Sequence, residues 1–152
     1  MKLLISTLLL MLSFKTAKAQ ISEKAYRLML NSMLSRSVPE MEVTTLKQAK
    51  KEMTLLDARE KNEFQVSHLK GAINVGYNNF HLDSIAGIAK DAPIVVYCSI
   101  GYRSEKVAEQ LQAAGFENVF NLYGGIFSWV NDGNAIFLSL IHISEPTRRA
   151  II

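Results

Sequence analysis

Short apolar segments alternate with helix-like segments along this chain, and one of them, Ile94–Tyr97, constrains the fold most. It follows Pro93, consists of β-branched and aromatic residues, and ends at Cys98, after which a loop containing Gly101 leads into a helical pattern. A short apolar run between turn signals indicates a buried strand, and strands that alternate with helices indicate a parallel sheet covered by helices. We therefore expect an α/β fold, and 152 residues are enough for one domain with a substantial core.

The same patterns predict the other elements. Expected strands cover residues 41–43, 53–57, 72–75, 94–98 and 119–122, and expected helices cover residues 45–52, 61–66, 81–89, 103–114 and 126–130. Thr44 is the expected cap of the helix 45–52, and Gly115 ends the helix 103–114. A further helix over residues 21–38, stopped by Pro39, is expected to supply an N-terminal helical arm, residues 20–37, ahead of the domain.

The first 19 residues have the features of a secretory signal peptide. Lys2 precedes a short leucine-rich run, and the small-residue pattern Ala17-Lys18-Ala19 follows it, so cleavage is expected before Gln20. The apolar run is shorter than the ~20 residues that cross a bilayer, which disfavours a membrane anchor. We expect a periplasmic or secreted protein without a membrane span after cleavage.

The last 15 residues, 138–152, follow neither a helical nor a strand period. They resemble the translation of a transposase-end sequencing adapter, and we interpret them as a non-native tail rather than a genuine flexible one. His142, Arg148 and Arg149 are therefore given no role. The domain itself is expected to cover residues 38–137.

The charge balance argues against one class of partners. The chain has 17 Lys and Arg and 14 Asp and Glu, a formal net charge of +3. Three of the lysines lie in residues 1–19, and two arginines and one glutamate lie in residues 138–152, so 12 basic and 13 acidic residues remain between these ends. That part carries about −1 and gives no reason to expect binding to nucleic acid or to an anionic membrane.

Cys98 lies where a parallel sheet presents ligand sites, at the carboxyl end of a strand and beside the start of a helix. The backbone N–H groups of the loop Ser99–Ser104 and of the helix beginning at Arg103 offer partial positive charge, which favours a thiolate over a thiol. Gly101 lets the loop bend, Ser104 can cap the helix, and Arg103 supplies a permanent cation suited to an oxyanion. This combination favours a nucleophilic cysteine over one more buried apolar residue.

Several separated motifs are similar to those of one family. They are Leu55-Leu56-Asp57-Ala58-Arg59-Glu60, Phe64 with residues 67–74, residues 96–104, and Asn121-Leu122-Tyr123-Gly124-Gly125-Ile126 with Trp129. Over residues 38–132 the chain resembles the rhodanese-like sulfurtransferases. The resemblance implies a three-layer α/β domain with a five-stranded, mostly parallel sheet flanked by helices, and no metal or cofactor.

The resemblance also implies a double displacement in which the Cys98 thiolate takes sulfane sulfur from thiosulfate or a polysulfide and passes it to a thiol or to cyanide. The implied substrate-binding residues are Arg103, Arg59, Ser99, Ile100, Gly101, Tyr102 and Ser104. Arg59 could instead be a surface residue that forms an ion pair, and the sequence does not favour either role. His68 is expected to be packed and hydrogen-bonded, and Trp129 to pack the domain. The expected partners are small donors and acceptors, with a protein sulfur acceptor as a further option.

Two other functions stay open. Cysteine-dependent phosphatases, and arsenate reductases with them, place five residues between Cys and Arg, whereas Ser99–Tyr102 places four here. A smaller ring of amides suits a single sulfur better than a phosphoryl group with three equatorial oxygens. The other alternative is a noncatalytic module that carries sulfur or binds a partner, to which the N-terminal arm could contribute.

Overall fold

The computed structural model describes residues 24–138, and these fall into two parts, one up to residue 35 and one from residue 36 onward. In the first part, residues 24–33 are helical and residues 34 and 35 are not. The expected helix over 21–38 is therefore too long at its C-terminal end. Arg36, at the start of the second part, has φ 55°, a left-handed conformation that does not continue a helix. The expected signal peptide and residues 139–152 lie outside the described residues.

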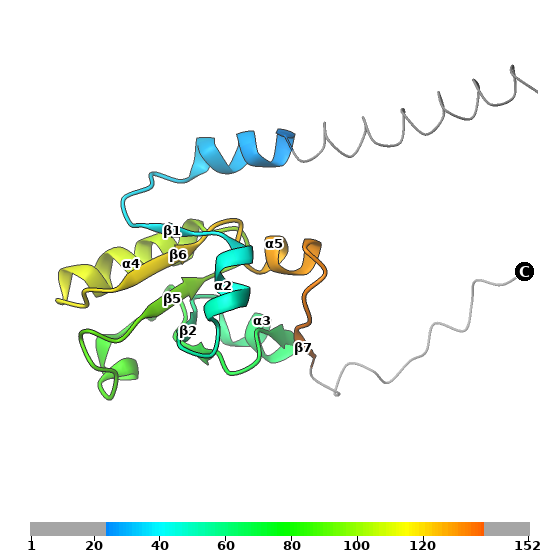
Figure 1. Ribbon diagram of the computed structural model, residues 1–152. Helices are drawn as coiled ribbons and strands as arrows, with labels where there is room; N and C mark the ends of the chain where they lie inside the picture. The colour runs from blue at the N-terminus through cyan, green and yellow to red at the C-terminus, as the bar shows by residue number, and fades with distance from the viewer. Residues whose placement is uncertain (1–23, 139–152) are drawn as a thin grey trace, which may run out of the picture. The chain divides into compact units, whose positions relative to one another are not determined.

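A five-stranded sheet lies at the centre of the second part (Figure 1). Its order is β1 (Glu40–Met41), β6 (Val119–Leu122), β5 (Ile94–Tyr97), β2 (Thr54–Asp57) and β4 (Ile73–Asn74). Each neighbouring pair is parallel, with Leu56 opposite Val96 in β2 and β5. The prediction of a mostly parallel five-stranded sheet is confirmed.

Helices cover both faces of this sheet and complete three layers. The helices α2 (Val43–Ala49) and α5 (Gly125–Asn131) pack on one face, and α4 (Tyr102–Ala113) and the short 3₁₀ helix η1 (Leu82–Ile85) pack on the other. The helix α3 (Lys61–Val66) follows β2 and contacts the next strand, β3 (Ser67–His68). The carboxyl ends of the strands therefore lie at one end of the sheet, and α4 begins there.

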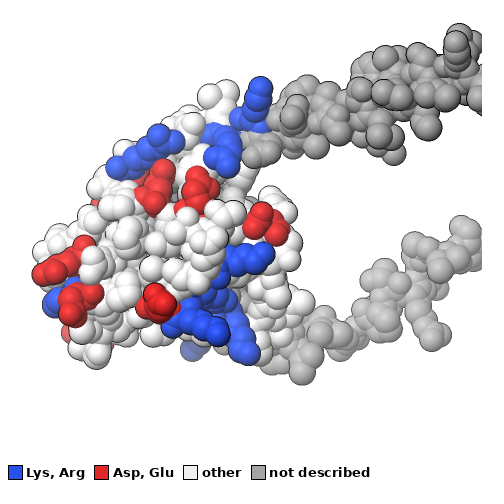
Figure 2. Space-filling model, viewed as in Figure 1, with Lys and Arg blue, Asp and Glu red and all other residues white. Residues whose placement is uncertain are grey.

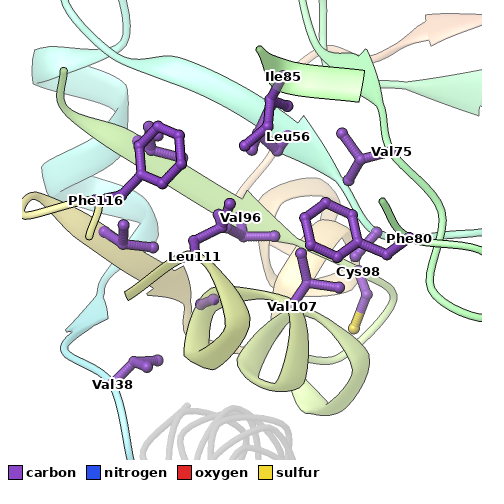
Figure 3. Packing of buried hydrophobic residues seen from close by; sticks show 14 residues of the cluster. Val38, Leu56, Val75, Phe80, Ile85, Val96, Cys98, Val107, Leu111 and Phe116 are labelled. Carbon is purple, nitrogen blue, oxygen red and sulfur yellow. The ribbon is translucent and has the colours of Figure 1, made fainter. Parts of the chain in front are cut away.

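The alternation of side chains along β5 divides the core into two clusters. Ile94, Val96 and Cys98 point into the cluster with α4, and Val95 and Tyr97 point into the cluster with α2 and α5. Every residue of β5 is buried, as a strand covered on both faces requires. Figure 3 shows the first cluster, with Cys98 near Val107 of α4 and near Phe80.

Two local predictions are wrong. Residues 81–89 form only the 3₁₀ turn of η1 instead of a helix, since Ile85 is the buried anchor of that turn and Gly87 follows it closely. The helix α2 begins two residues early, with Glu42 rather than Thr44 at the N-cap position. Burial of Val43 and Leu46, three residues apart on one helical face, places Val43 inside the first turn.

A second, two-stranded sheet is absent from the sequence prediction. Ser67 pairs with Leu138 and His68 with Phe137 in an antiparallel ladder between β3 and β7 (Phe137–Leu138). The ring of His68 stacks on Phe64 with 3.9 Å between ring centroids, and its Nδ1 lies 2.9 Å from the carbonyl oxygen of Phe64. The expected packed role of His68 is confirmed, and Leu138, the first residue of the expected tail, pairs with Ser67 in this ladder.

The surface of the domain carries both signs of charge. On the face shown in Figure 2, acidic side chains lie among basic ones. Within residues 24–138, no helix combines the length and the apolar character that a membrane crossing requires.

Candidate active site

Cys98 lies directly after β5, at the carboxyl end of the sheet, and its residue surface is 1% exposed. The N–H group of Gly101 donates a hydrogen bond to the Cys98 sulfur at 3.1 Å. Gly101 is the N-cap of α4 and has φ 115°, a conformation that residues with a side chain rarely adopt. The expected bend at Gly101 is therefore present, and it turns a backbone amide toward the sulfur.

A polar network from β6 holds this loop from behind. The Asn121 side-chain NH₂ donates to the carbonyl oxygen of Gly101 at 3.0 Å, and the Ser104 hydroxyl lies 2.7 Å from Asn121 Oδ1 and 3.0 Å from the same carbonyl. Asn121 and Ser104 are both fully buried. Because the Gly101 carbonyl is fixed, the Gly101–Tyr102 peptide group and its N–H are fixed with it, directly after the residue whose N–H binds the Cys98 sulfur.

The start of α5 holds the other end of the loop. The N–H of Ile126 donates to the carbonyl of Cys98 at 2.9 Å, and the N–H of Phe127 donates to the carbonyl of Ser99 at 3.2 Å. Gly125 has φ 58°, and a Cβ atom there would lie 2.7 Å from the carbonyl carbon and oxygen of Ser99. Only glycine allows the two backbones to approach this closely.

Arg103, in the first turn of α4, is held by a carboxylate from α3. Its Nη1 donates to Oε2 of Glu63 at 2.7 Å, and its Nη2 donates to Oε1 of Glu63 at 2.9 Å. Nη2 also donates to the hydroxyl oxygen of Ser99 at 3.0 Å. This two-point geometry fixes the plane of the guanidinium group beside the loop.

The pair is strongly coupled electrostatically. The hydrogen bond from Arg103 lowers the pKa of Glu63 to about 2, against the opposing effect of burial, and the backbone N–H of Glu60 assists it. The same hydrogen bond raises the pKa of Arg103 above its usual range, with a smaller contribution from Cys98. Glu63 is thus an anion, and Arg103 is a cation beside the Cys98 loop.

Arg59 is buried and does not lie at the surface, contrary to the alternative considered from the sequence. Its guanidinium donates to Oδ2 of Asp57 at 2.7 Å and to the carbonyl oxygen of Ser67 at 2.6 Å. Burial would lower the pKa of Arg59, but the hydrogen bond and the charge of Asp57 raise it above its usual range. These contacts belong to a residue that fixes the end of β2, and none of them joins Arg59 to Cys98.

The remaining predicted site residues differ in their exposure. Ile100 is half-buried and Tyr102 is 42% exposed, while Ser104 lies in the network behind the loop and not at the N-cap position, which Gly101 occupies. Two residues now central to the site, Glu63 and Asn121, had no predicted role. In the part of the chain that the structure describes, no group of three or more His, Cys, Asp or Glu side chains is arranged to hold a metal ion.

Comparison with known proteins finds relatives that match somewhat more than half of this chain. A thiosulfate sulfurtransferase of Shewanella oneidensis is 37% identical over 86 residues, which cover 56% of this chain and 82% of that protein. A tRNA uridine(34) hydroxylase of Buchnera aphidicola is 34% identical over 87 residues, which cover 54% of this chain and 28% of that protein. The chain thus spans about a quarter of the length of such hydroxylases.

Solved structures agree on the fold. A rhodanese-related protein of Thermoplasma volcanium has a TM-score of 0.60 at 27% identity, covering 66% of this chain and 99% of that chain. The rhodanese-like domain of an Anabaena protein has a TM-score of 0.64 at 21% identity, covering 76% and 91% of the two chains, and shows the shared fold alone. The family model of the rhodanese-like domain matches residues 42–132, a span that contains the strands β2, β4, β5 and β6 of the five-stranded sheet and the Cys98 loop. On this evidence the chain belongs to the rhodanese-like domain family.

Proposed function

We propose that this protein is a sulfurtransferase that carries sulfane sulfur on Cys98. The observation that carries the proposal is the hydrogen bond from the Gly101 amide to the Cys98 sulfur, 3.1 Å long, inside a loop with four residues between Cys98 and Arg103. An amide aimed at a sulfur at the end of a buried strand stabilises negative charge there, both on a thiolate and on a persulfide. The similarity to a thiosulfate sulfurtransferase supports the same reaction class.

The first step loads the cysteine. The Cys98 thiolate attacks the outer sulfur of thiosulfate, a new S–S bond forms at Cys98, the S–S bond of thiosulfate breaks, and sulfite leaves with the electron pair. A polysulfide donor reacts in the same way, with the shortened polysulfide as leaving group. In this proposal Arg103, whose guanidinium plane is fixed by Glu63 and Ser99, orients a donor oxygen.

The second step unloads it. Cyanide or a thiolate attacks the terminal sulfur of the Cys98 persulfide, the S–S bond breaks, and the electron pair returns to Cys98 as thiolate. Thiocyanate or a new persulfide is the product. The loop amides that stabilised the persulfide anion then stabilise the regenerated thiolate, so one arrangement serves both halves of the reaction.

A mass measurement tests the proposal directly. Cys98 is the only cysteine in the sequence, so a sulfur adduct on a thiol can lie nowhere else. After incubation with millimolar thiosulfate or a polysulfide, the intact mass should rise by ~32 Da, one sulfur atom, and return to its starting value when cyanide is added. Cys98→Ser should show no gain.

Two results would replace the proposal. Turnover of an aryl phosphate without a sulfur adduct from any donor would assign the chain to the cysteine-dependent phosphatases, the alternative that loop length disfavours. Absence of both reactions would leave a noncatalytic domain, as can occur when such a domain is one part of a longer protein. The similarity to tRNA uridine(34) hydroxylases extends over the shared domain and does not transfer their hydroxylation to this chain.

A further inference from the structure

Two cations beside β2 and the Cys98 loop, Arg59 and Arg103, are each paired with a carboxylate. Arg103 binds both oxygens of Glu63, and Arg59 binds Asp57 through Nη2 and Nε. Glu63 also interacts electrostatically with Arg59. The four side chains therefore form one chain of alternating charges with a formal sum of zero, and a thiolate at Cys98 makes the sum −1.

Glu63 is fixed in this position and remains charged. Its Oε2 accepts a hydrogen bond from the backbone N–H of Glu60 at 3.1 Å, as part of a capping box at the start of α3, in addition to the bond from Arg103. The side chains of Arg103 and Glu63 are 24% and 34% exposed, so solvent screens their charges only in part. With a pKa of about 2, Glu63 is ionised throughout the neutral range.

Arg103 keeps capacity for a donor despite this pairing. A guanidinium group has five N–H donors, and Glu63 and Ser99 use three of those on Arg103. The other two N–H groups remain to donate to an oxygen of a bound donor. Arg103 thus offers hydrogen bonds to a donor, but the net positive charge that would attract a dianion is cancelled by Glu63.

We propose that Glu63 is a specificity-determining residue that makes Cys98 favour sulfur donors of low negative charge over dianions such as thiosulfate. The inference rests on the proposed sulfur transfer and names the donor class for it. Repulsion from a site of charge −1 is twice as large for a dianion as for a monoanion of similar size. A thiosulfonate or an organic persulfide, each with one negative charge, therefore fits the site better.

Two donors that differ in charge test this inference. Thiosulfate carries two negative charges and benzenethiosulfonate carries one, and both deliver an outer sulfur by cleavage of an S–S bond, with sulfite or benzenesulfinate as leaving group. Thiocyanate formation with saturating cyanide gives kcat/KM for each donor. In Glu63→Gln the ratio of kcat/KM for thiosulfate to that for benzenethiosulfonate should rise about tenfold, the effect of ~1.4 kcal/mol for one unit charge acting at this range.

The ratio separates specificity from a structural role, because loss of Arg103 positioning or of folded protein lowers both rates together. Glu52→Gln is the matched control, because it makes the same change of charge on an exposed side chain just before β2. Glu52 lies at the amino ends of the parallel strands and Cys98 at their carboxyl ends, so this variant should leave the ratio unchanged. Glu63→Asp keeps the charge and should keep the wild-type ratio even where both rates fall. A ratio in Glu63→Gln within twofold of wild type would overturn the inference.

A measurement on the wild-type protein covers the case in which Glu63→Gln does not fold. Salt weakens attraction and repulsion alike, so kcat/KM for thiosulfate should hold or rise as KCl increases at neutral pH. A marked fall would mean that the dianion is attracted, and would overturn the inference. Failure of both donors to add sulfur to Cys98, seen by intact mass, would refute the sulfurtransferase proposal itself, whereas loading by both donors with an unchanged ratio would refute only the role of Glu63.

Discussion

Replacement of Gly125 by alanine tests whether the Cys98 loop depends on close contact with α5. A Cβ atom at this position would lie 2.7 Å from the carbonyl carbon and oxygen of Ser99, which are backbone atoms and cannot rotate away. The hydrogen bonds from Ile126 to Cys98 and from Phe127 to Ser99 would have to lengthen to relieve the contact. Overpacking of this kind costs ~1–3 kcal/mol, and a left-handed φ costs a residue with a Cβ a further ~1–2 kcal/mol.

Gly133→Ala separates these two costs. Gly133 has φ 74°, close in kind to the 58° of Gly125, but nothing lies within 4 Å of the Cβ position there. Gly133→Ala should therefore lose only the ~1–2 kcal/mol of the left-handed conformation. The free energy of unfolding should be lower in Gly125→Ala than in Gly133→Ala by ~1–3 kcal/mol, the part due to the backbone contact.

Urea unfolding followed by tryptophan fluorescence measures this difference. Trp129 is the only tryptophan, is 4% exposed, and donates from Nε1 to the carbonyl of Ala135 at 3.0 Å, so its emission reports on α5. Equal destabilisation in the two variants would show that the loop and α5 do not constrain each other. That result would refute the close approach as the reason for glycine at position 125.

Three further predictions concern the site. Arg103→Ala should lower thiosulfate turnover by one to a few powers of ten, since loss of a charged contact costs roughly 2–5 kcal/mol, and unchanged kinetics would remove Arg103 from the site. Glu63→Gln should be less stable than wild type by about 1–2 kcal/mol at pH 7, a value reduced for partial exposure. Because the folded-state pKa of Glu63 is lowered to about 2, its stabilisation is present above the unfolded value of 4.5 and is lost as pH falls toward 2, so urea titrations should converge at acid pH. Asn121→Ala should cost ~1–3 kcal/mol, since it removes two buried hydrogen bonds, one to the Gly101 carbonyl and one with the Ser104 hydroxyl, and urea midpoints equal to wild type would contradict that network.

The strands that hold the site could be predicted closely from the sequence. The strand 119–122 agrees with β6 residue for residue, and the strand ending at Cys98 agrees with β5 within one residue. The run 94–97 is buried throughout and the run 119–122 is buried except at the half-buried Phe120, and such short buried runs are typical of strands covered on both faces. The predictions failed where a short-range preference competed with packing, as at residues 81–89, and where two distant segments pair, as in the ladder between β3 and β7.

The residues that complete the site were harder to find. Glu63 and Arg103 are 40 positions apart, and a glutamate on a short helix is typical of a solvent-exposed face. The spacing of Glu60 and Glu63 does suggest a capping box, but it says nothing of a bidentate arginine. Asn121 could be recognised as part of a family motif, yet its contact with the Gly101 carbonyl exists only when β5 and β6 lie side by side.

The anchoring of the Cys98 loop by β6 and α5 has a consequence for the order of folding. The ribosome has made the whole loop once Ser104 has been added to the chain. The residues that bind the carbonyl oxygens of the loop, Asn121, Ile126 and Phe127, are added later. The loop therefore acquires its shape only when the last parallel strand and the helix after it dock. Until then the sheet around Cys98 is unfinished, and the site that we propose to carry sulfur is complete only together with the core.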